Sequence, residues 1–584
     1  AQITEQAHGL SALAAGLTAL LNDPLNLRWC SSTPKFLLAV LVLYPLGVYC
    51  YLLDQADRRP GEEHGSAHWG NAKELNERYR NRKDPRQEII LSQNIRISND
   101  SYQHQRNLHV VVIGGSGSGK TRFFVKPNAL QCSGSYFFLD PKGELTYSLG
   151  GAMEENGVTV TVIDFVHFRG HYNPVAYLKT DEDAMKLAYA LVFNTKKNPA
   201  ASGGENEFWD KSAVMFLASL ILYILYESPL YERNLNTMMD MILECKVSED
   251  SYDENRMDIL FGELEQRDPH HPAVLQYRSF KLGSAKTLSS IMVTAVSNLH
   301  MLQSAAFAEM IASDEMFLPK LGVEKRAIFC VIPDNDDTFN FMVSILYTQL
   351  FDQLFRLADS TPEFHGTLPV HVRLMMDEFA NVATPENFVK ILAVARSRNI
   401  SCDIILQNIS QIKSKYKDDW ETIIGNCDSL VYLGGNDYST FEYISKLLGK
   451  QTIRTKGQSI GKGSHGSSSD SYQVTGRELM TPDEVRRMKR SDCLVMISGE
   501  APVRDKKYNL FDHPNLKYTP DYRSPRGLLH RFATPIPAPE GYTMPPDYMA
   551  QAGTVSLAYV AELTCPEITE DLYDELQEWE ESLL

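Results

Sequence analysis

The stretch LHVVVIGGSGSGKT, residues 108–121, decides the fold. The apolar run Leu108–Ile113 predicts a buried strand, and residues 114–121 match the pattern G-x-x-x-x-G-K-[ST] directly before the helix-like run TRFFVKPNALQ. A strand, a glycine loop and a helix in this order are typical of a P-loop, whose backbone N–H groups wrap phosphate. The residues predicted to bind nucleotide phosphates are Gly114, Gly115, Ser116, Gly117, Ser118, Gly119, Lys120 and Thr121.

Two residues of this motif have separate expected roles. Lys120 is predicted to reach the β- and γ-phosphates, and the Thr121 hydroxyl is predicted to ligate Mg²⁺. ATP and Mg²⁺ are therefore the expected cofactors. The alternative is a glycine-rich turn that binds no nucleotide.

A second motif is acidic. In VHVRLMMDE, residues 370–378, an apolar strand ends in two acidic residues. Asp377 fits a second Mg²⁺ ligand, and Glu378 fits the base that activates the attacking water. An acidic pair after an apolar run is also a common strand end. Together with a P-loop, however, it favours an ATP-hydrolysing site.

Two further candidates lie beyond this pair. The strand-like run CDIILQ ends in Gln407, at the sheet edge where the phosphates are expected, so Gln407 is a candidate γ-phosphate sensor. Arg396 ends a predicted helix over residues 385–398 and can complete the site of an adjacent subunit. The alternative for Arg396 is a surface arginine favoured by the helix dipole.

Apolar runs alternate with helical patterns along most of the chain, which predicts an α/β fold with a parallel sheet. Strand signals are mostly missing between Asp164 and Ala327, which predicts an inserted all-helical domain. Residues 60–102 are interpreted as a polar connector and the Gly/Ser-rich residues 456–471 as a flexible loop. The predicted strands are 108–113, 136–140, 158–164, 327–332, 370–377, 404–407, 430–433 and 494–497.

Charge and cysteine content limit the possible functions. The net charge is −17, so any nucleic-acid contact must be confined to a local basic surface. Nine acidic residues and no basic ones lie between Glu562 and Glu581. The nine cysteines have no short paired spacing, which argues against a zinc clamp or a disulfide scaffold.

One segment is long and apolar enough to cross a membrane. Residues 36–53, FLLAVLVLYPLGVYCYLL, carry no charge over eighteen positions. Basic residues are more frequent after this segment than before it, which places the C-terminal bulk in the cytoplasm by the positive-inside rule. A buried core helix is the alternative interpretation.

Six motifs together resemble the type IV secretion coupling proteins, the TraG-type conjugal DNA-transfer ATPases. The resemblance covers nearly the whole chain and is closest to a branch from integrative elements of Gram-positive bacteria. The motifs are GSAHWG (65–70), GGSGSGKT (114–121), FLDPKGE (138–144), FWDKSA (208–213), LMMDEFANV (374–382) and RELMTPDEV (477–485).

The resemblance implies a RecA-like P-loop domain with an inserted all-α domain and an N-terminal transmembrane anchor. It implies a homohexameric DNA translocase in the cell membrane that couples relaxase-bound, single-stranded DNA to a secretion channel and relaxosome proteins. It also implies that Arg396 is an arginine finger and Gln407 a sensor. The alternatives are an FtsK-like or protein-secretion ATPase, and a substrate receptor with little turnover.

Domain boundaries follow from these observations. The family usually has two membrane helices, so the first is expected upstream of Ala1. The expected domains are an N-terminal extracytoplasmic segment with a transmembrane helix over 1–57 (span 36–53), a nucleotide-binding domain over 58–180 and 320–525, an all-α insertion over 181–319, and an acidic tail over 526–584.

Overall fold

The computed structural model describes the central part of the chain and its membrane-type helix. The described residues are 33–56, 62–141, 143–194, 204–245, 256–333, 338–381, 387–460 and 468–522, with Thr18, Leu21, Asp336 and Pro385. The predicted acidic tail, 526–584, and almost all of the predicted extracytoplasmic segment lie outside these residues.

A nine-stranded sheet organises the fold, in the order β13-β12-β9-β3-β8-β7-β4-β6-β5. Strands from β9 to β5 run parallel, whereas β12 is antiparallel to both β9 and β13. The strands are β3 (Val110–Ile113), β4 (Ser135–Pro141), β5 (Thr159–Asp164), β6 (Arg326–Ile332), β7 (Val372–Met376), β8 (Ile400–Leu406), β9 (Ser429–Tyr432), β12 (Asp492–Ile497) and β13 (Val503–Lys506).

The apolar runs explain this sheet. Every residue of β3, β7 and β8 is buried, as expected when helices cover both faces of a parallel sheet. In the register of the sheet, Val111 of β3 pairs with Ile404 of β8 and Leu430 of β9. All eight predicted strands are present, so the α/β fold prediction is confirmed, while β13 was not predicted.

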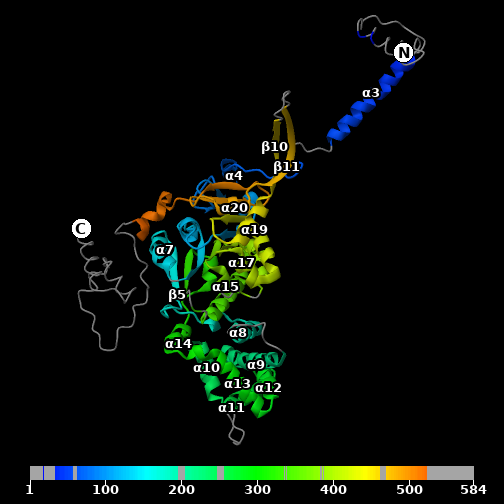
Figure 1. Ribbon diagram of the computed structural model, residues 1–584. Helices are drawn as coiled ribbons and strands as arrows, with labels where there is room; N and C mark the ends of the chain where they lie inside the picture. The colour runs from blue at the N-terminus through cyan, green and yellow to red at the C-terminus, as the bar shows by residue number, and fades with distance from the viewer. Residues whose placement is uncertain are drawn as a thin grey trace, which may run out of the picture. The chain divides into compact units, whose positions relative to one another are not determined.

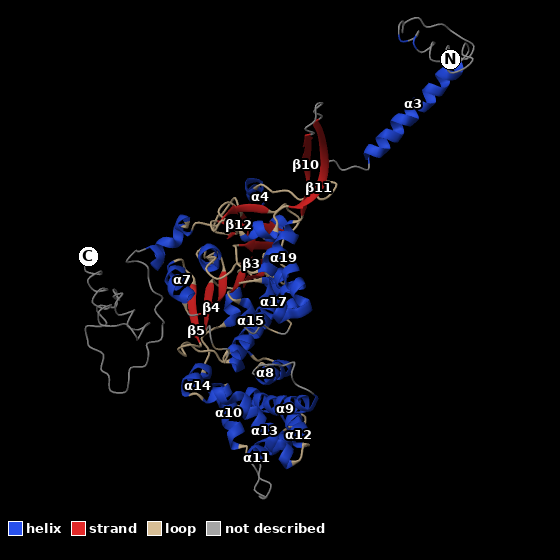
Figure 2. Cartoon of the chain, viewed as in Figure 1, coloured by secondary structure: helices blue, strands red, loops and turns tan. Residues whose placement is uncertain are grey.

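Helices surround this sheet (Figure 2). The longest of them, α15, buries twelve side chains, including Tyr347 and Phe351. These helices are η1 (Thr121–Val125), α6 (Lys126–Ala129), α7 (Glu144–Glu155), α15 (Asn340–Ser360), η7 (Pro362–Phe364), η8 (Phe379–Asn381), α16 (Phe388–Ala395), η9 (Arg396–Arg398), α17 (Ile409–Tyr416), η10 (Lys417–Asp419), α18 (Trp420–Gly425), α19 (Tyr438–Leu448), α20 (Pro482–Arg486), η11 (Leu510–Asp512), η12 (Pro514–Tyr518) and η13 (Pro520–Tyr522).

Between β5 and β6 every described element is helical (Figure 1). The central helix α9 is apolar enough to pass a test for a membrane span, but 72% of that segment is buried inside the protein, so it is a core helix. The elements are η2 (Pro174–Tyr177), α8 (Asp181–Phe193), α9 (Gly204–Glu227), η4 (Leu230–Glu232), α10 (Leu235–Glu244), α11 (Arg256–Arg267), α12 (Pro272–Lys281), α13 (Ala285–Leu299), η5 (His300–Gln303), α14 (Ala305–Ala312) and η6 (Leu318–Gly322).

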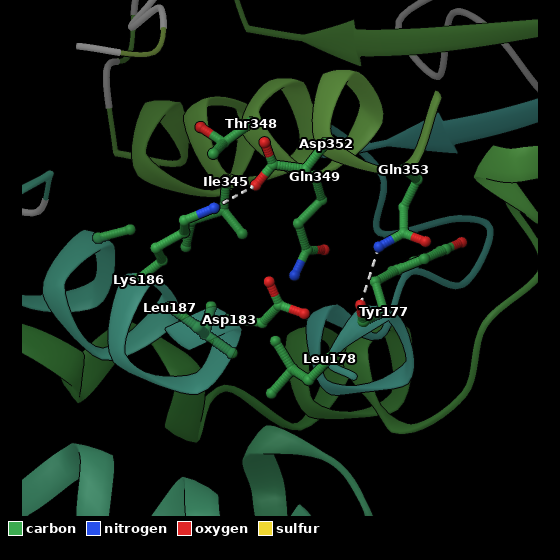
Figure 3. A pocket seen from close by; sticks show the side chains of 11 residues that line it. Tyr177, Leu178, Asp183, Lys186, Leu187, Ile345, Thr348, Gln349, Asp352 and Gln353 are labelled. Atoms are coloured by element: carbon green, nitrogen blue, oxygen red, sulfur yellow. Dashed lines mark hydrogen bonds and ion pairs between the residues drawn. The ribbon is translucent and has the colours of Figure 1, made fainter. Parts of the chain in front are cut away.

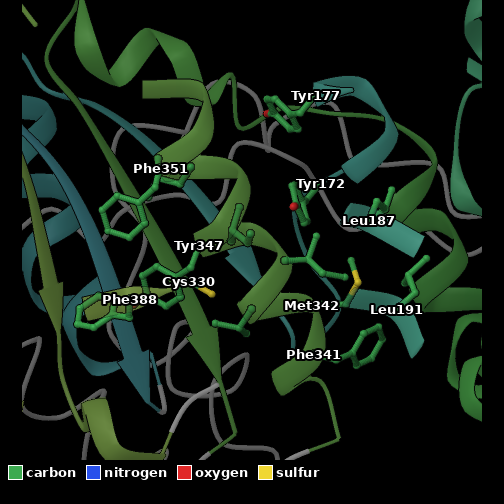
Figure 4. Packing of buried hydrophobic residues seen from close by; sticks show 14 of the residues in the cluster. Tyr172, Tyr177, Leu187, Leu191, Cys330, Phe341, Met342, Tyr347, Phe351 and Phe388 are labelled. Carbon is green, nitrogen blue, oxygen red and sulfur yellow. The ribbon is translucent and has the colours of Figure 1, made fainter. Parts of the chain in front are cut away.

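The hydrophobic core continues from the sheet into this helical part. Leu187 and Leu191 of α8 belong to the same buried cluster as Met342 and Tyr347 of α15 and Cys330 of β6 (Figure 4). Polar contacts follow the same junction, where Lys186 binds Asp352 at 3.0 Å and the pair lines a small pocket between α8 and α15 (Figure 3). None of the residues that line this pocket is a predicted site residue.

The predicted membrane segment lies within α3 (Thr33–Ala56), one continuous helix that contains Pro45. Its span Thr33–Leu52 is long and apolar enough to cross a membrane, and none of it is buried against the rest of the protein. Within the described residues this helix is therefore not part of the buried core. The observation is consistent with a membrane anchor.

The polar-connector prediction for residues 60–102 is wrong. This segment forms α4 (Ala72–Tyr79), α5 (Ser101–His104) and an antiparallel hairpin of β1 (Glu88–Ile90) with β2 (Arg96–Ser98). Ile89 and Ile97 face each other in the hairpin and are almost fully buried. Its apolar positions are too few and too closely spaced to stand out from the surrounding charges.

The flexible-loop prediction for residues 456–471 is wrong over its two flanks. Strands β10 (Lys450–Ile460) and β11 (Ser468–Glu478) form an antiparallel hairpin over eleven residue pairs. Its root alternates β-branched residues, with Ile453 opposite Thr475, a pattern that favours strand over loop. Only residues 461–467, which contain most of the glycine pattern, lie outside the described residues.

Candidate functional site

The predicted P-loop connects β3 to a short helix at the carboxyl-terminal edge of the parallel strands. Gly117 and Gly119 adopt φ values of 71° and 87°, which glycine tolerates far better than other residues. A Cβ at Gly119 would lie 2.4 Å from the Phe123 ring, so the loop has no room for a side chain there. At the start of the loop, the Gly115 N–H donates to the Gly434 carbonyl at 2.9 Å.

Lys120 and Ser118 have polar atoms directed toward the loop itself. The Lys120 ammonium donates to the Gly114 carbonyl at 3.0 Å. The Ser118 hydroxyl is buried and has no hydrogen-bond partner among the described residues. Buried polar groups are nearly always satisfied, so this hydroxyl fits a ligand oxygen. The loop therefore has the donors that a phosphate group requires.

Thr121 and Asp377, the two predicted Mg²⁺ ligands, lie next to each other. The Thr121 hydroxyl lies 3.4 Å from the Asp377 carboxylate, at the junction of η1 with the end of β7. Burial raises the pKa of Asp377, while Lys120 opposes that shift. A hydroxyl and a carboxylate beside a phosphate loop suit Mg²⁺, which takes few protein ligands and completes its shell with water and phosphate.

Glu378 and Gln407 are also brought together. The Gln407 side-chain amide donates to the Glu378 carboxylate at 2.8 Å. Glu378 has a φ of 52°, and its N–H donates to the Asp377 carboxylate at 3.0 Å. A non-glycine residue in the left-handed region costs free energy and is typical of functional sites. This backbone turn directs two successive carboxylates to one edge.

Arg396 is not part of this cluster. It lies in η9 just before β8 begins, at the sheet edge opposite the P-loop, and its side chain is exposed. Arg398, two positions on, instead forms a 2.7 Å ion pair with Asp359. Arg396 therefore lies away from the P-loop of its own chain.

Two residues near the site had no predicted role. Asp140 ends β4 inside the FLDPKGE motif and accepts hydrogen bonds from the N–H groups of Leu145 and Thr146 and from the Thr146 hydroxyl. These hydrogen bonds tie Asp140 to the start of α7, and burial raises the pKa of Asp140 to about 6. Lys507 donates to the Ser118 carbonyl at 2.9 Å, and no sequence pattern marked it.

Comparison with known proteins identifies the family. The model of the type IV secretory system conjugative DNA transfer family matches residues 62–536, most of the chain. The chain belongs to this family. The family prediction is confirmed, whereas the assignment to a Gram-positive branch stays a prediction.

Family members with curated names are distant in sequence. Conjugal transfer protein TraG of Rhizobium radiobacter is 23% identical over 413 residues, which cover 68% of this chain and 61% of TraG. A TraG of Escherichia coli is 25% identical over 453 residues, covering 70% of this chain and 68% of that protein. The chain thus spans about three fifths to two thirds of these relatives.

Solved structures of a conjugative coupling protein share the fold. The conjugative coupling protein TrwB in its trigonal form with sulphate has a TM-score of 0.55 and 16% identity over 77% of this chain and 96% of TrwB. TrwB in complex with ADP and Mg²⁺ has a TM-score of 0.52, 16% identity and coverage of 77% and 95%. The similarity supports a P-loop coupling-protein fold with a RecA-like core.

Proposed function

We propose that this protein is a membrane-anchored ATPase that moves DNA through a conjugative secretion channel. The observation that carries the proposal is the convergence of Lys120, Thr121, Asp377, Glu378 and Gln407, from three separate strand ends, on one edge of the sheet. Membership of a conjugative DNA transfer family supplies the class of cargo.

Nucleotide binding is assigned to the loop of residues 114–121. Its N–H groups and the Lys120 ammonium hold the phosphates, and the helix dipole adds positive potential at the same point. Thr121 and Asp377 would hold Mg²⁺, which would supply positive charge to stabilise the phosphates. TrwB in complex with ADP and Mg²⁺ supports this choice of cofactors.

Hydrolysis requires a base that orients water toward the γ-phosphate. Glu378 occupies that position because it follows the Mg²⁺ ligand directly and its carboxylate is held by Gln407 at 2.8 Å. A γ-phosphate that attracts the Gln407 amide would release the Glu378 carboxylate for the water. Gln407 thereby links the state of the nucleotide to the base.

A ring of six subunits accounts for the position of Arg396. Its exposed side chain lies at the sheet edge opposite its own P-loop, so it is available to a neighbouring subunit. A guanidinium supplied in trans stabilises charge on the transferred phosphoryl group. The homohexamer, the relaxase-bound DNA cargo, the secretion-channel and relaxosome partners and the cytoplasmic location of the bulk belong to this proposal.

The decisive experiment measures ATP hydrolysis by the full chain in detergent, with and without single- or double-stranded DNA. Wild type should turn over ATP faster with DNA, and Lys120→Ala should abolish nucleotide binding. Turnover that is indifferent to DNA would favour a protein-pumping ATPase instead. Absence of both binding and turnover in wild type would overturn the proposal.

A further inference from the structure

Lys507 is a buried lysine directly behind the P-loop. Only 8% of it is exposed, its ammonium donates to the Ser118 carbonyl at 2.9 Å, and it lies 5.3 Å from the centre of the Phe123 ring. Ser118 and Lys507 are 389 positions apart in the sequence. The contact therefore depends on the tertiary fold and not on the local loop.

This ammonium has no carboxylate partner among the described residues. Asp492, at the start of the neighbouring strand β12, is already bound by Arg504 at 2.9 Å and by Lys506 at 2.6 Å. A buried charge without a counter-ion in contact is costly. Burial lowers the pKa of Lys507, and the charge of Asp492 opposes that shift only in part. A buried positive charge without a counter-ion in contact can stabilise an anion that binds nearby.

The geometry of the loop indicates which anion. A loop that directs its N–H groups to one side, as a phosphate nest does, exposes carbonyl groups on the other side, where they need donors. Lys507 supplies that donor to Ser118, whose neighbours Gly117 and Gly119 both have positive φ. A phosphate in the loop would lie on the far side of one peptide layer from the ammonium.

Contacts further along hold Lys507 in place. The segment 507–522 runs beside the helix that follows the P-loop, with Arg122 stacked 5.5 Å from the Phe511 ring centre and Lys126 paired with Asp521 at 2.6 Å. Asn515 also donates to the Leu130 carbonyl at 2.8 Å. The ammonium is thus positioned before any nucleotide binds.

We propose that Lys507 is a positioning residue of the nucleotide site, which fixes the Ser118 peptide for phosphate binding and lacks its own counter-ion until the phosphate arrives. This inference rests on the proposed nucleotide binding. It assigns to the segment that follows β13 a role in holding ATP and ADP, although Lys507 contacts the loop and not the phosphate.

The test compares Lys507→Met with Lys506→Met in the full chain. Lys506 is the adjacent lysine, is 59% exposed in its side chain and pairs with Asp492, so it controls for the loss of one positive charge. Calorimetric titration with ADP and with a non-hydrolysable ATP analogue gives the affinities, and thermal melting without nucleotide gives the stability. Lys507→Gln retains a hydrogen-bond donor without the charge.

Lys507→Met should weaken both nucleotides about tenfold or more, while the melting temperature without nucleotide stays the same or rises, because an unpaired buried charge has been removed. Lys507→Gln should recover part of the affinity, and Lys506→Met should bind like wild type. Unchanged affinity in Lys507→Met, or a loss matched by a falling melting temperature, would overturn the inference. If wild type itself bound neither nucleotide, the proposed function would fail instead.

Discussion

The two edges of the parallel strands differ in what holds them. At the carboxyl-terminal edge the backbone adopts positive φ values and side chains form the candidate site. At the amino-terminal edge backbone hydrogen bonds join distant segments of the chain. The first edge places Gly117, Gly119 and Glu378 at positive φ. At the second edge the chain that follows α3 forms backbone hydrogen bonds with distant segments. There Ala67 donates to the Lys450 carbonyl at 2.9 Å and Gly70 to the Pro502 carbonyl at 2.9 Å.

This difference separates two kinds of sensitivity. Substitutions of side chains at the first edge should change the free energy of unfolding little but lower the rate of ATP hydrolysis strongly. The second edge joins the chain that follows α3 to the sheet through close backbone contacts. A Cβ at Gly65 would lie 2.2 Å from the Lys450 carbonyl oxygen. Changes there should affect stability and leave nucleotide binding intact.

The largest expected effect is at the first edge. Glu378→Gln should lower the ATP hydrolysis rate by roughly 10²–10⁴-fold, the usual contribution of a general base. Glutamine has a similar shape and retains a partner for Gln407, so ADP affinity and melting temperature should stay close to wild type. Rates and affinities measured on the same preparation test this. A variant that hydrolyses ATP at the wild-type rate would remove Glu378 from the mechanism.

The next effect concerns the sheet between the edges. Arg373 of β7 and Asp403 of β8 are buried and form two hydrogen bonds of 2.6 and 3.0 Å, and Arg373 also donates to Asn128 at 3.2 Å. Arg373→Met strands a buried carboxylate and should cost about 3–5 kcal/mol of unfolding free energy. Chemical denaturation measures the loss.

The matched control for that prediction removes both charges. Arg373→Met combined with Asp403→Leu leaves no buried ion and should recover much of the lost stability. Equal instability in the single and double variants would show that packing, not the stranded charge, dominates. The ion pair links β7 and β8, the strands that lead into Glu378 and Gln407. Its loss should therefore also disturb the positions of these two side chains relative to each other.

The sequence predicted the first edge well because parallel strands bring their carboxyl ends together. Once residues 108–113, 370–377 and 404–407 were recognised as strands, Lys120, Glu378 and Gln407 had to share an edge. Their roles remain predictions, but their proximity is observed. Local pattern and topology were sufficient for this part.

The parts that sequence reasoning missed depend on long-range register. Lys507 meets Ser118 only because β13 pairs antiparallel with β12, and neither residue has a local pattern that indicates the contact. The hairpin of β10 and β11 was hidden by its Gly/Ser composition. Its root is stabilised by Gly65, whose carbonyl accepts from the Thr452 N–H at 3.1 Å.

A smaller effect is expected at the second edge, where lowering the pH should lower the free energy of unfolding. His109, just before β3, is fully buried and accepts a hydrogen bond from the Cys402 N–H at 3.0 Å; burial lowers its pKa to about 4. Below pH 6.5 the unfolded chain binds a proton there that the folded chain does not, so acid favours unfolding. Each pH unit between these values removes about 1.4 kcal/mol of stability through this group.

His109→Asn keeps an acceptor for the Cys402 N–H and removes the titration. Between neutral pH and about pH 5 the variant should therefore lose roughly 2 kcal/mol less stability than wild type. Denaturant unfolding at both pH values measures the difference. His371, whose burial also lowers its pKa to about 3, should keep a remaining acid sensitivity in the variant. Equal acid sensitivity in both proteins would contradict the assignment to His109.

The smallest effect tests whether the two edges are independent. Asn71 caps α4 by accepting a hydrogen bond from the Lys73 N–H at 3.0 Å. Helix α4, the first helix after α3, buries Leu75 and Tyr79. Asn71→Ala should cost about 1 kcal/mol of unfolding free energy, whereas Asn71→Ser retains a cap and should cost less. ADP affinity should be unchanged in both, because α4 packs against β2 and α5 and not mainly against the P-loop. A loss of affinity in Asn71→Ala but not in Asn71→Ser would show that the anchor side of the sheet is coupled to the nucleotide side through α4.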